Sequence, residues 1–473
     1  MRFLRRHRQG NVVRPGRPED ERYPPGQLLA YGTQHILTMY GGVIAPPLIV
    51  GGAAGLAPSD LALLVTAGLF VSGLATLLQT LGLGPFGSRL PIVQGISFAS
   101  VSTMVAIASG DGLRPVFGAI VVAGLIGLVL STFFAQLVRL FPAVVTGSII
   151  TVIGLSLMPV AFRWAMGNND QAPDFGSMEN IGYAGLTLLV ILTISRVFQG
   201  AISRLSILIG LAVGTLVAVA TGQADFSAVG HARPLALPPV LHFGSPTFEV
   251  GAIVSMTIVI LVIMTETTAD LLAIGEIVGT EVGPRRVADG LRADMAATTV
   301  APLFGTFPCS AFAQNVGLVA LTGVKSRYVV ATGGLVLLLL GLLPPVGAVV
   351  AAIPYPVLGG AGIVLFGSVA AAGIRSLSRV QYQDNLNMVI VSVAVAVGII
   401  PIAAPTFWDA FPESFRVVMD SGISATALVA VVLNLLFNEV TAGNRPGASV
   451  FAASQDRRDS LGERLHGDRR AAR

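Results

Sequence analysis

The sequence predicts an all-α membrane protein, because it combines very low charge with high hydrophobicity and many long apolar runs. Of its 473 residues, 53% are hydrophobic and 11% are charged, and the mean hydropathy is +0.78. A soluble domain usually carries about 25% charged residues, so most of this surface is expected to face lipid. The 55 glycines and 28 prolines then indicate closely packed, interrupted helices rather than disorder.

Fourteen apolar runs can be marked along the chain, and they predict fourteen transmembrane segments. A simple helical span needs roughly 20 apolar residues. The third run and the tenth run are short or broken by Pro and Gly, which is typical of the segments that form a transporter's binding site. The runs are 27–46, 60–82, 90–109, 115–138, 143–161, 181–198, 204–221, 250–277, 287–304, 309–322, 328–344, 346–371, 386–403 and 420–438.

The basic residues predict the orientation of these segments. If the segments alternate from a cytoplasmic N-terminus, nearly all of the 29 Lys and Arg residues lie on the cytoplasmic side. By the positive-inside rule, both termini are expected in the cytoplasm and the protein in the plasma (inner) membrane. The same rule explains the basic tails, so no nucleic-acid partner is expected. The basic residues expected outside are Arg114, Arg163, Arg233 and Arg416.

A weak internal similarity predicts two repeats. Residues 90–99 in the third run resemble residues 307–313 in the tenth, and both stretches contain a proline followed by small residues and a phenylalanine. Seven segments separate them, and an odd number inverts the second repeat in the membrane, as in inverted-repeat carriers. Chance similarity between two stretches of small residues is the alternative interpretation.

The expected organisation follows from these runs. Both tails are expected to be disordered, and no linker rich in Ser and Gly divides the chain. The predicted parts are a cytoplasmic basic tail at 1–25, a first seven-span repeat at 26–222, an outer loop at 223–249, a second seven-span repeat at 250–440 and a cytoplasmic tail at 441–473.

Two acidic residues lie within the eighth apolar run. Glu266 and Asp270 are four residues apart, so they share one face of a helix. Mutual repulsion and low polarity both disfavour their charged forms, and at least one is expected to hold a proton near neutral pH. A proton is therefore the expected coupling ion, with sodium left open. The alternative is that one carboxyl only caps or bonds a broken helix nearby.

Two further polar positions are candidates for the same machinery. Asp294 follows Arg292 at the start of an apolar run, and it either pairs with that arginine or relays protons to Glu266. His35 follows Gln34 early in the first run, and it is either a hydrogen-bonded structural residue or part of the coupling and site geometry.

Several classes of function lack support in the sequence. Five histidines and the single Cys309 are scattered, so no metal site or cofactor is predicted, and the cysteine is expected to be a small buried residue. No phosphate-cradling loop is present, which argues against ATP-driven transport. No nucleophile and base are paired, so the protein is not expected to be an enzyme.

These residues together resemble a known family of transporters. Gln314-Asn315-Val316-Gly317 with Thr322, the pair Gln34-His35, the pattern of Glu266 and Asp270, and Asp294 are similar to motifs of the nucleobase–ascorbate transporter (nucleobase–cation symporter) family. The xanthine and uric acid permease branch is the most similar. The resemblance runs from about residue 26 to residue 437 and leaves out only the tails. In place of Ala269, many relatives have glycine before the aspartate.

The resemblance implies a fold and a set of roles. It implies fourteen spans in two inverted repeats, a core and a gate domain, short extended strands in spans 3 and 10 with the substrate between them, and homodimers. The resemblance implies that the side chains of Glu266 and Gln314 contact a purine ring, with main-chain contacts from Phe98 and Ala313. It implies that Phe98 and Phe312 flank the ring. It also implies that Asp270, Asp294 and Asn315 tune protonation, geometry and coupling, and that His35 supports the site.

The function expected on these grounds is proton-coupled uptake of xanthine or uric acid, or both, by alternating access. Gln314 is typical of the purine branch, whereas uracil carriers have Glu there. A symporter of uracil or another nucleobase, and an anion exchanger of the related sulfate and bicarbonate transporter fold, are the alternatives within transport. A carboxylate such as Glu266 at the centre of the site argues against the exchanger. A non-transporting membrane sensor is less favoured, because no signalling domain is attached.

Overall fold

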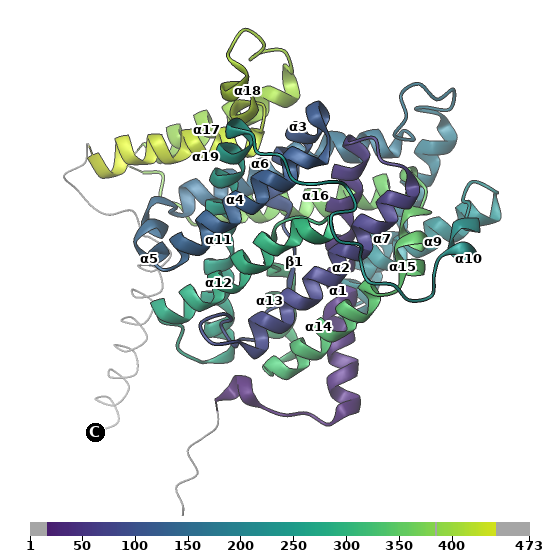
Figure 1. The fold of residues 1–473 in the computed structure, drawn as a ribbon, viewed down its shortest axis with the longest axis horizontal. Helices are drawn as coiled ribbons and strands as arrows, with labels where there is room; N and C mark the ends of the chain where they lie inside the picture. Colours follow the sequence, from purple (N-terminus) through teal and green to yellow (C-terminus); the bar gives the residue numbers. More distant parts are fainter. Residues whose placement is uncertain (1–16, 384–385, 441–473) are drawn as a thin grey trace, which may run out of the picture.

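The computed structural model describes residues 17–383 and 386–440, and within them the protein is mostly helical (Figure 1). The elements up to residue 249 are η1 (Pro18–Asp20), α1 (Pro25–Ala53), α2 (Pro58–Leu81), β1 (Gln94–Ile96), η2 (Phe98–Ser100), α3 (Val101–Asp111), α4 (Leu113–Ser131), α5 (Phe134–Leu137), η3 (Val138–Leu140), α6 (Ala143–Ala165), α7 (Met178–Val197), α8 (Ala201–Arg204), α9 (Ser206–Ala220) and α10 (Ser227–His231). The later elements are α11 (Val250–Val278), α12 (Pro284–Val300), η4 (Ala301–Phe304), β2 (Cys309–Ala311), α13 (Ala313–Thr322), α14 (Arg327–Gly341), α15 (Pro344–Ala351), α16 (Tyr355–Leu377), α17 (Asn387–Ala403), α18 (Glu413–Met419), α19 (Gly422–Asn434) and the π-helical turn η5 (Leu435–Val440).

The apolar helices confirm the prediction of a mostly helical chain with several membrane spans. Within the described residues, α1, α2, α4, α6, α7, α11 and α16 are the 7 helices that are long and apolar enough to cross a membrane. α14 and α15, which are bent by 79° at a short break, add an eighth candidate if they count as one span. The remaining apolar helices are shorter, and each predicted apolar run overlaps at least one helix.

The predicted run 346–371 is wrong as a single segment. α15 ends at Ala351 and α16 begins at Tyr355, with Pro354 immediately before the new helix. Proline disfavours the helical conformation at the residue that precedes it and has no N–H for the helical ladder. The chain therefore changes direction at this point although its hydrophobicity continues without interruption.

Two short strands lie at the middle of the helical assembly (Figure 1). β1 and β2 pair antiparallel, with Gln94 opposite Ala311 and Ile96 opposite Cys309. α1 and α2 contact β1, whereas α11 and α12 contact β2. The extended segments expected in the third and tenth runs are thus present, and they pair with each other although about 215 residues separate them in the sequence.

The helices form two packed groups. α1, α2, α4, α11, α12 and α14 pack around one another and around the strand pair, whereas α7, α9, α17 and α19 pack on the pair formed by α6 and α16. Glycine allows α6 and α16 to approach closely: a Cβ at Gly154 would collide with the backbone of Ala370, and one at Gly373 with the backbone of Thr151. Small residues at such contacts are the usual way in which membrane helices pack backbone to backbone.

The segment before α1 is folded against the ends of other helices. Glu19 is only 1% exposed, and its carboxylate accepts a hydrogen bond from Arg286, which follows the loop between α11 and α12, at 2.7 Å. Asp20 pairs with Arg327 at the start of α14 at 2.6 Å. We call residues 17–21 the N-terminal clasp.

The clasp corrects the expectation of a disordered N-terminal tail. That expectation is wrong for residues 17–24, where specific ion pairs hold the chain in place. Residues 1–16 and the predicted tail at 441–473 lie outside the described residues.

Candidate functional site

The outward-facing backbone groups of the strand pair are bonded to threonine side chains. In an antiparallel pair, alternate residues point their N–H and C=O groups away from the partner strand. The Gln94 N–H donates to Thr76 Oγ1 at 3.0 Å, and the same hydroxyl donates to the Gln94 carbonyl at 3.2 Å. On the other strand, the Cys309 N–H donates to Thr298 Oγ1 at 3.1 Å. Helices α2 and α12 thereby satisfy backbone groups that water cannot reach at membrane depth.

A third threonine connects β2 with helix α11 and with Asp294. Thr267 Oγ1 accepts a hydrogen bond from the Ala311 N–H at 3.2 Å and donates one to Asp294 Oδ2 at 2.6 Å. The other carboxylate oxygen of Asp294 lies 3.5 Å from the donor Nε2 of Gln79 on α2. The sequence signalled Asp294, but it gave no sign that Thr267 and Gln79 are its partners.

The structure rejects one of the two interpretations of Asp294. Arg292 donates to Asp289 at 2.5 Å and to the Thr132 hydroxyl at 3.3 Å, so the arginine is engaged at the helix surface. Asp294, at 0% exposure, points instead toward α11 and α2. Asp289 precedes Arg292 by three residues, so this ion pair follows the ordinary spacing of neighbours on one helix face.

His35 and Asn315 join α1 to α13. The Asn315 carboxamide nitrogen lies 3.0 Å from the His35 backbone carbonyl and 3.1 Å from His35 Nδ1. A carbonyl only accepts hydrogen bonds, so this geometry fixes the amide orientation and makes Nδ1 an acceptor. Both side chains are buried, and the side-chain oxygen of Asn315 has no hydrogen-bond partner within the part of the chain that the structure describes. The hydrogen bonds expected of a structural His35 are therefore present, and its part in coupling stays a prediction.

Glu266 and Asp270 lie one turn apart on α11, as the spacing predicts. Both are partly exposed, whereas Thr265, Thr267 and Thr268 beside them are buried. No hydrogen bond or ion pair joins either carboxylate to another described side chain. α11 contacts η2 of the third run and β2 and α13 of the tenth run. The two carboxylates therefore lie on a helix that borders both interrupted segments.

The predicted residues of the tenth run differ in exposure. Ala313 and Gln314 begin α13 and are exposed, whereas Phe312 is only 4% exposed. A Cβ at Gly42 of α1 would meet the Phe312 ring at 2.6 Å, and one at Gly95 of β1 would also meet this ring. The missing side chains at these two glycines therefore leave the space that Phe312 fills.

Phe98 lies at the boundary between the two groups of helices. Its ring is partly exposed and packs edge to face against Phe366 of α16, with the ring centroids 6.2 Å apart. The same ring would lie 3.5 Å from a Cβ at Gly42. Phe98 and Phe312 thus flank one stretch of α1, with Phe98 on the more open side.

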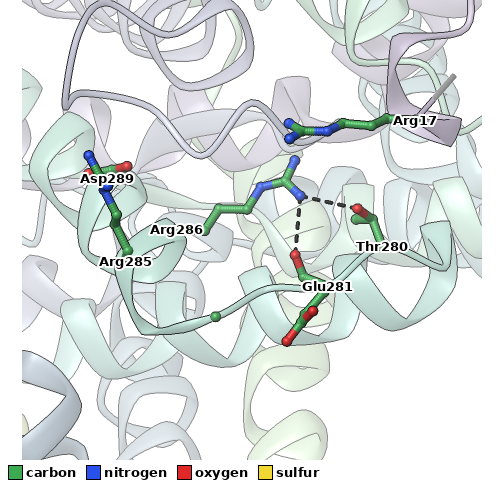
Figure 2. A pocket seen from close by; sticks show the side chains of 7 residues that line it. Arg17, Thr280, Glu281, Arg285, Arg286 and Asp289 are labelled. Atoms are coloured by element: carbon green, nitrogen blue, oxygen red, sulfur yellow. Dashed lines mark hydrogen bonds between the residues drawn. The ribbon is translucent and has the colours of Figure 1, made fainter. Parts of the chain in front are cut away.

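A cavity lies away from these residues, at one end of α11. It has a volume of about 450 Å³ and lies at the loop between α11 and α12, where Arg17, Arg285 and Arg286 surround it (Figure 2). Figure 2 shows Arg286 bonded to Thr280 and to the Glu281 backbone. Thr280 follows Glu266 by 14 residues, which is about 20 Å along a helix. This surface cavity does not include the predicted site residues.

Comparison with known proteins identifies the family. The profile described as "Permease family" matches residues 26–407. The chain is 39% identical over 429 residues to "Uric acid transporter UacT" of Escherichia coli (strain K12), covering 90% of this chain and 89% of that protein. The chain belongs to the permease family. The permease is also 39% identical over 413 residues to "Xanthine permease" of Bacillus subtilis (strain 168), covering 87% and 94% of the two chains.

Membership of this family confirms three expectations drawn from the sequence. The resemblance to the xanthine and uric acid permease branch is correct, the protein belongs among transporters rather than enzymes, and it is a multi-pass membrane protein. The matched region begins at residue 26, next to the start of α1, and includes every predicted site residue.

Solved structures of two other proteins resemble the fold of the permease at low sequence identity. The transmembrane domain of the cyanobacterium bicarbonate transporter BicA matches with a TM-score of 0.59 at 17% identity, covering 88% of this chain and 98% of that one. Murine Slc26a9 in the inward-facing state matches with a TM-score of 0.60 at 13% identity, covering 88% and 69%. These two likenesses concern the fold alone.

Proposed function

We propose that the permease carries a purine nucleobase, xanthine or uric acid or both, into the cell together with a proton. The observation that carries this proposal is a pair of partly exposed, unbonded carboxylates on α11, Glu266 and Asp270, next to an interrupted segment that presents the exposed Gln314. The names of the relatives, a uric acid transporter and a xanthine permease, support a purine as the substrate.

The proposed recognition uses in-plane polar contacts and aromatic faces. A purine base offers ring N–H groups and carbonyls, which a carboxylate at Glu266 and a carboxamide at Gln314 complement. Main-chain groups of Phe98 and Ala313 are the further proposed contacts, at the points where η2 and α13 begin. Phe98 supplies the accessible aromatic face, and the buried Phe312 supports the site from behind.

The proposed coupling ion is a proton, and no cofactor is involved. Ionisable groups within the membrane are expensive and usually mark proton or substrate pathways. Glu266 and Asp270 are the proposed proton carriers, while Asp294, Asn315 and His35 hold the geometry around them. Sodium is the alternative coupling ion.

The proposed transport cycle is alternating access by two domains. The helices around the strand pair form the core, and the group around α6 and α16 forms the gate. Corresponding helix contacts in the two halves support two inverted seven-span repeats. The contact between α1 and α14 corresponds to the contact between α11 and α4, and the contact between α7 and α9 corresponds to that between α17 and α19. The proposed permease lies in the inner membrane with both termini in the cytoplasm, and it forms a homodimer.

The test is uptake of labelled xanthine, urate and uracil into proteoliposomes with an imposed proton gradient. We expect accumulation of a purine driven by the gradient, and loss of that drive in Glu266→Gln. If the variant accumulates as much purine as the wild type, Glu266 has no role in proton coupling. If uptake by the wild type does not respond to the proton gradient but depends on sodium, the coupling ion is sodium rather than a proton.

Anion exchange is the second candidate, because the fold matches a bicarbonate transporter. Carboxylates beside the strand pair oppose it, since they repel an anion at this point. The two candidates separate in the same assay, in which bicarbonate or sulfate at millimolar concentration should fail to compete with purine uptake.

A further inference from the structure

Thr267 differs from the other threonines of α11. Thr257, Thr265 and Thr268 each donate their hydroxyl hydrogen to the carbonyl four residues earlier in the same helix, at 2.7, 2.8 and 2.7 Å. Thr267 instead donates to Asp294 of α12 and accepts from the Ala311 N–H of β2. Its hydroxyl is therefore committed to tertiary bonds rather than to its own helix.

The position of this bond gives it a particular consequence. Thr267 directly follows Glu266, and Ala311 precedes Gln314 by three residues. The bond is thus a short connection between the helix that carries the carboxylate and the segment that carries the carboxamide. Any change in its length shifts these two groups relative to each other.

Asp294 determines the direction of the hydrogen bonds. Because its carboxylate accepts the only hydroxyl hydrogen of Thr267, a lone pair of Oγ1 remains to accept the Ala311 N–H. Without the hydroxyl, this N–H would be a buried donor with no partner, which is unfavourable away from water. The strand would relieve that penalty by moving away from α11.

We propose that Thr267 is a positioning residue for substrate recognition, whose hydroxyl sets the spacing between Glu266 and the segment that begins at Gln314. This inference rests on the proposed function, because it takes these two side chains as the contacts to the purine. Thr267 itself does not touch the substrate. Its influence passes through Ala311 and the strand pair.

The test compares three variants in purified protein and proteoliposomes. Thr267→Val keeps the shape and removes the hydroxyl, Thr267→Ser keeps the hydroxyl, and Thr268→Val removes a buried hydroxyl that bonds only within α11. We expect Thr267→Val to raise the KM for purine about tenfold, which corresponds to one lost buried hydrogen bond. Thr267→Ser should remain within about twofold of wild type, and Thr268→Val should be unchanged.

A second measurement tests the bond without any substrate. Hydrogen–deuterium exchange of a peptide covering 305–315 should be faster in Thr267→Val than in wild type, and unchanged in Thr268→Val. This readout keeps its meaning even if the wild type carries no purine, so it separates failure of this inference from failure of the proposed function. If Thr267→Val does not fold, Thr267→Ala takes its place in both measurements.

Two results of the transport measurements would overturn the inference. One is a variant lacking the hydroxyl that keeps the wild-type KM and loses only protein yield or maximal rate, which describes a purely structural role. The other is Thr267→Ser with a defect as large as that of Thr267→Val, which would assign the effect to the methyl group. Unchanged exchange at 305–315 would likewise remove the proposed connection between α11 and β2.

Discussion

Asn315 donates both hydrogens of its carboxamide to His35, one to the ring Nδ1 at 3.1 Å and one to the backbone carbonyl at 3.0 Å. This double contact fixes the imidazole as the neutral tautomer with its proton on Nε2. It also joins α13, which begins beside the strand pair, to the first span of the chain.

The ring bond of this pair should be measurable as a coupling energy. A double-mutant cycle with His35→Phe and Asn315→Ala is expected to give a coupling of about 1 kcal/mol, because one buried hydrogen bond is lost while the carbonyl bond survives in His35→Phe. The measurement is unfolding of the four proteins in detergent. Thr38→Val is the control, because its hydroxyl bonds only to Gln34 in the same helix. Additive effects within about 0.3 kcal/mol would contradict the prediction.

Gln314→Glu should weaken purine recognition. The substitution keeps the size of the side chain and replaces the amide donor with an acceptor, so a substrate carbonyl would lose its partner. We expect the Kd for xanthine or urate to rise about tenfold or more, measured by competition against labelled purine. Ala320→Ser, at another exposed position of α13, serves as the matched control. Unchanged competition in Gln314→Glu would place the residue outside the site.

Much of the fold was accessible from the sequence because its signals are local. Pro and small residues marked the third and tenth runs, and the strands lie there. The spacing of Glu266 and Asp270 predicted a shared helix face, which the structure confirms. The break before Pro354 is not predicted, because hydrophobicity continues across it and the apolar pattern gives no boundary there.

The partners of the site residues were not accessible, because they are distant in the chain. Gln79 and Asp294 are 215 residues apart, and a glutamine in an apolar span has no sequence signal for its partner. Thr267 was hidden for another reason: buried threonines usually bond to their own helix, as Thr265 and Thr268 do. The Arg292–Asp289 pair could have been found from its spacing of three residues.

Close packing between α6 and α16 makes Gly373 intolerant of a side chain. An added Cβ would collide with the Thr151 backbone, which cannot move aside as a flexible side chain could. Gly373→Ala is expected to destabilise the protein by about 1–3 kcal/mol. Gly182→Ala on α7 is the control, because a Cβ there meets nothing within 4 Å and alanine favours helix. Equal unfolding temperatures for the two variants would contradict this account.

The N-terminal clasp should stabilise the protein through its buried member. Glu19 is 1% exposed at its ion pair with Arg286, whereas Asp20 is 39% exposed at its pair with Arg327. Glu19→Gln is therefore expected to lower the free energy of unfolding by about 1–3 kcal/mol, and Asp20→Asn by less than about 1 kcal/mol. Unfolding in detergent measures both, and the reverse order would reject the burial argument.

Truncation gives an independent test of the same clasp. Deleting residues 1–16 removes none of the clasp contacts, whereas deleting residues 1–21 removes all of them. The longer deletion should lower the unfolding temperature clearly more than the shorter one. If the two deletions behave alike, the clasp does not contribute to stability.

A buried cluster of hydroxyls joins the two groups of helices. Thr103 of α3 lies 2.5 Å from Ser421, which precedes α19, and Ser255 of α11 lies 3.0 Å from Ser424. All four side chains are at 0% exposure. In the proposed orientation, this cluster lies toward the outer face, because α11 begins and α3 ends on that side. We therefore expect outward opening of the proposed gate to break these hydrogen bonds.

Thr103→Val should shift the protein toward the outward-open state. Loss of one shared hydroxyl weakens the closed arrangement by about 1 kcal/mol, which changes a two-state population about fivefold. Labelling from outside by an impermeant maleimide measures this shift on Ala425→Cys, placed beside the cluster in a Cys309→Ala background. The label should react faster when Thr103→Val is added, and at the original rate with Thr257→Val, whose hydroxyl bonds only within α11. Equal rates in all three proteins would mean that the cluster does not hold the outer face closed.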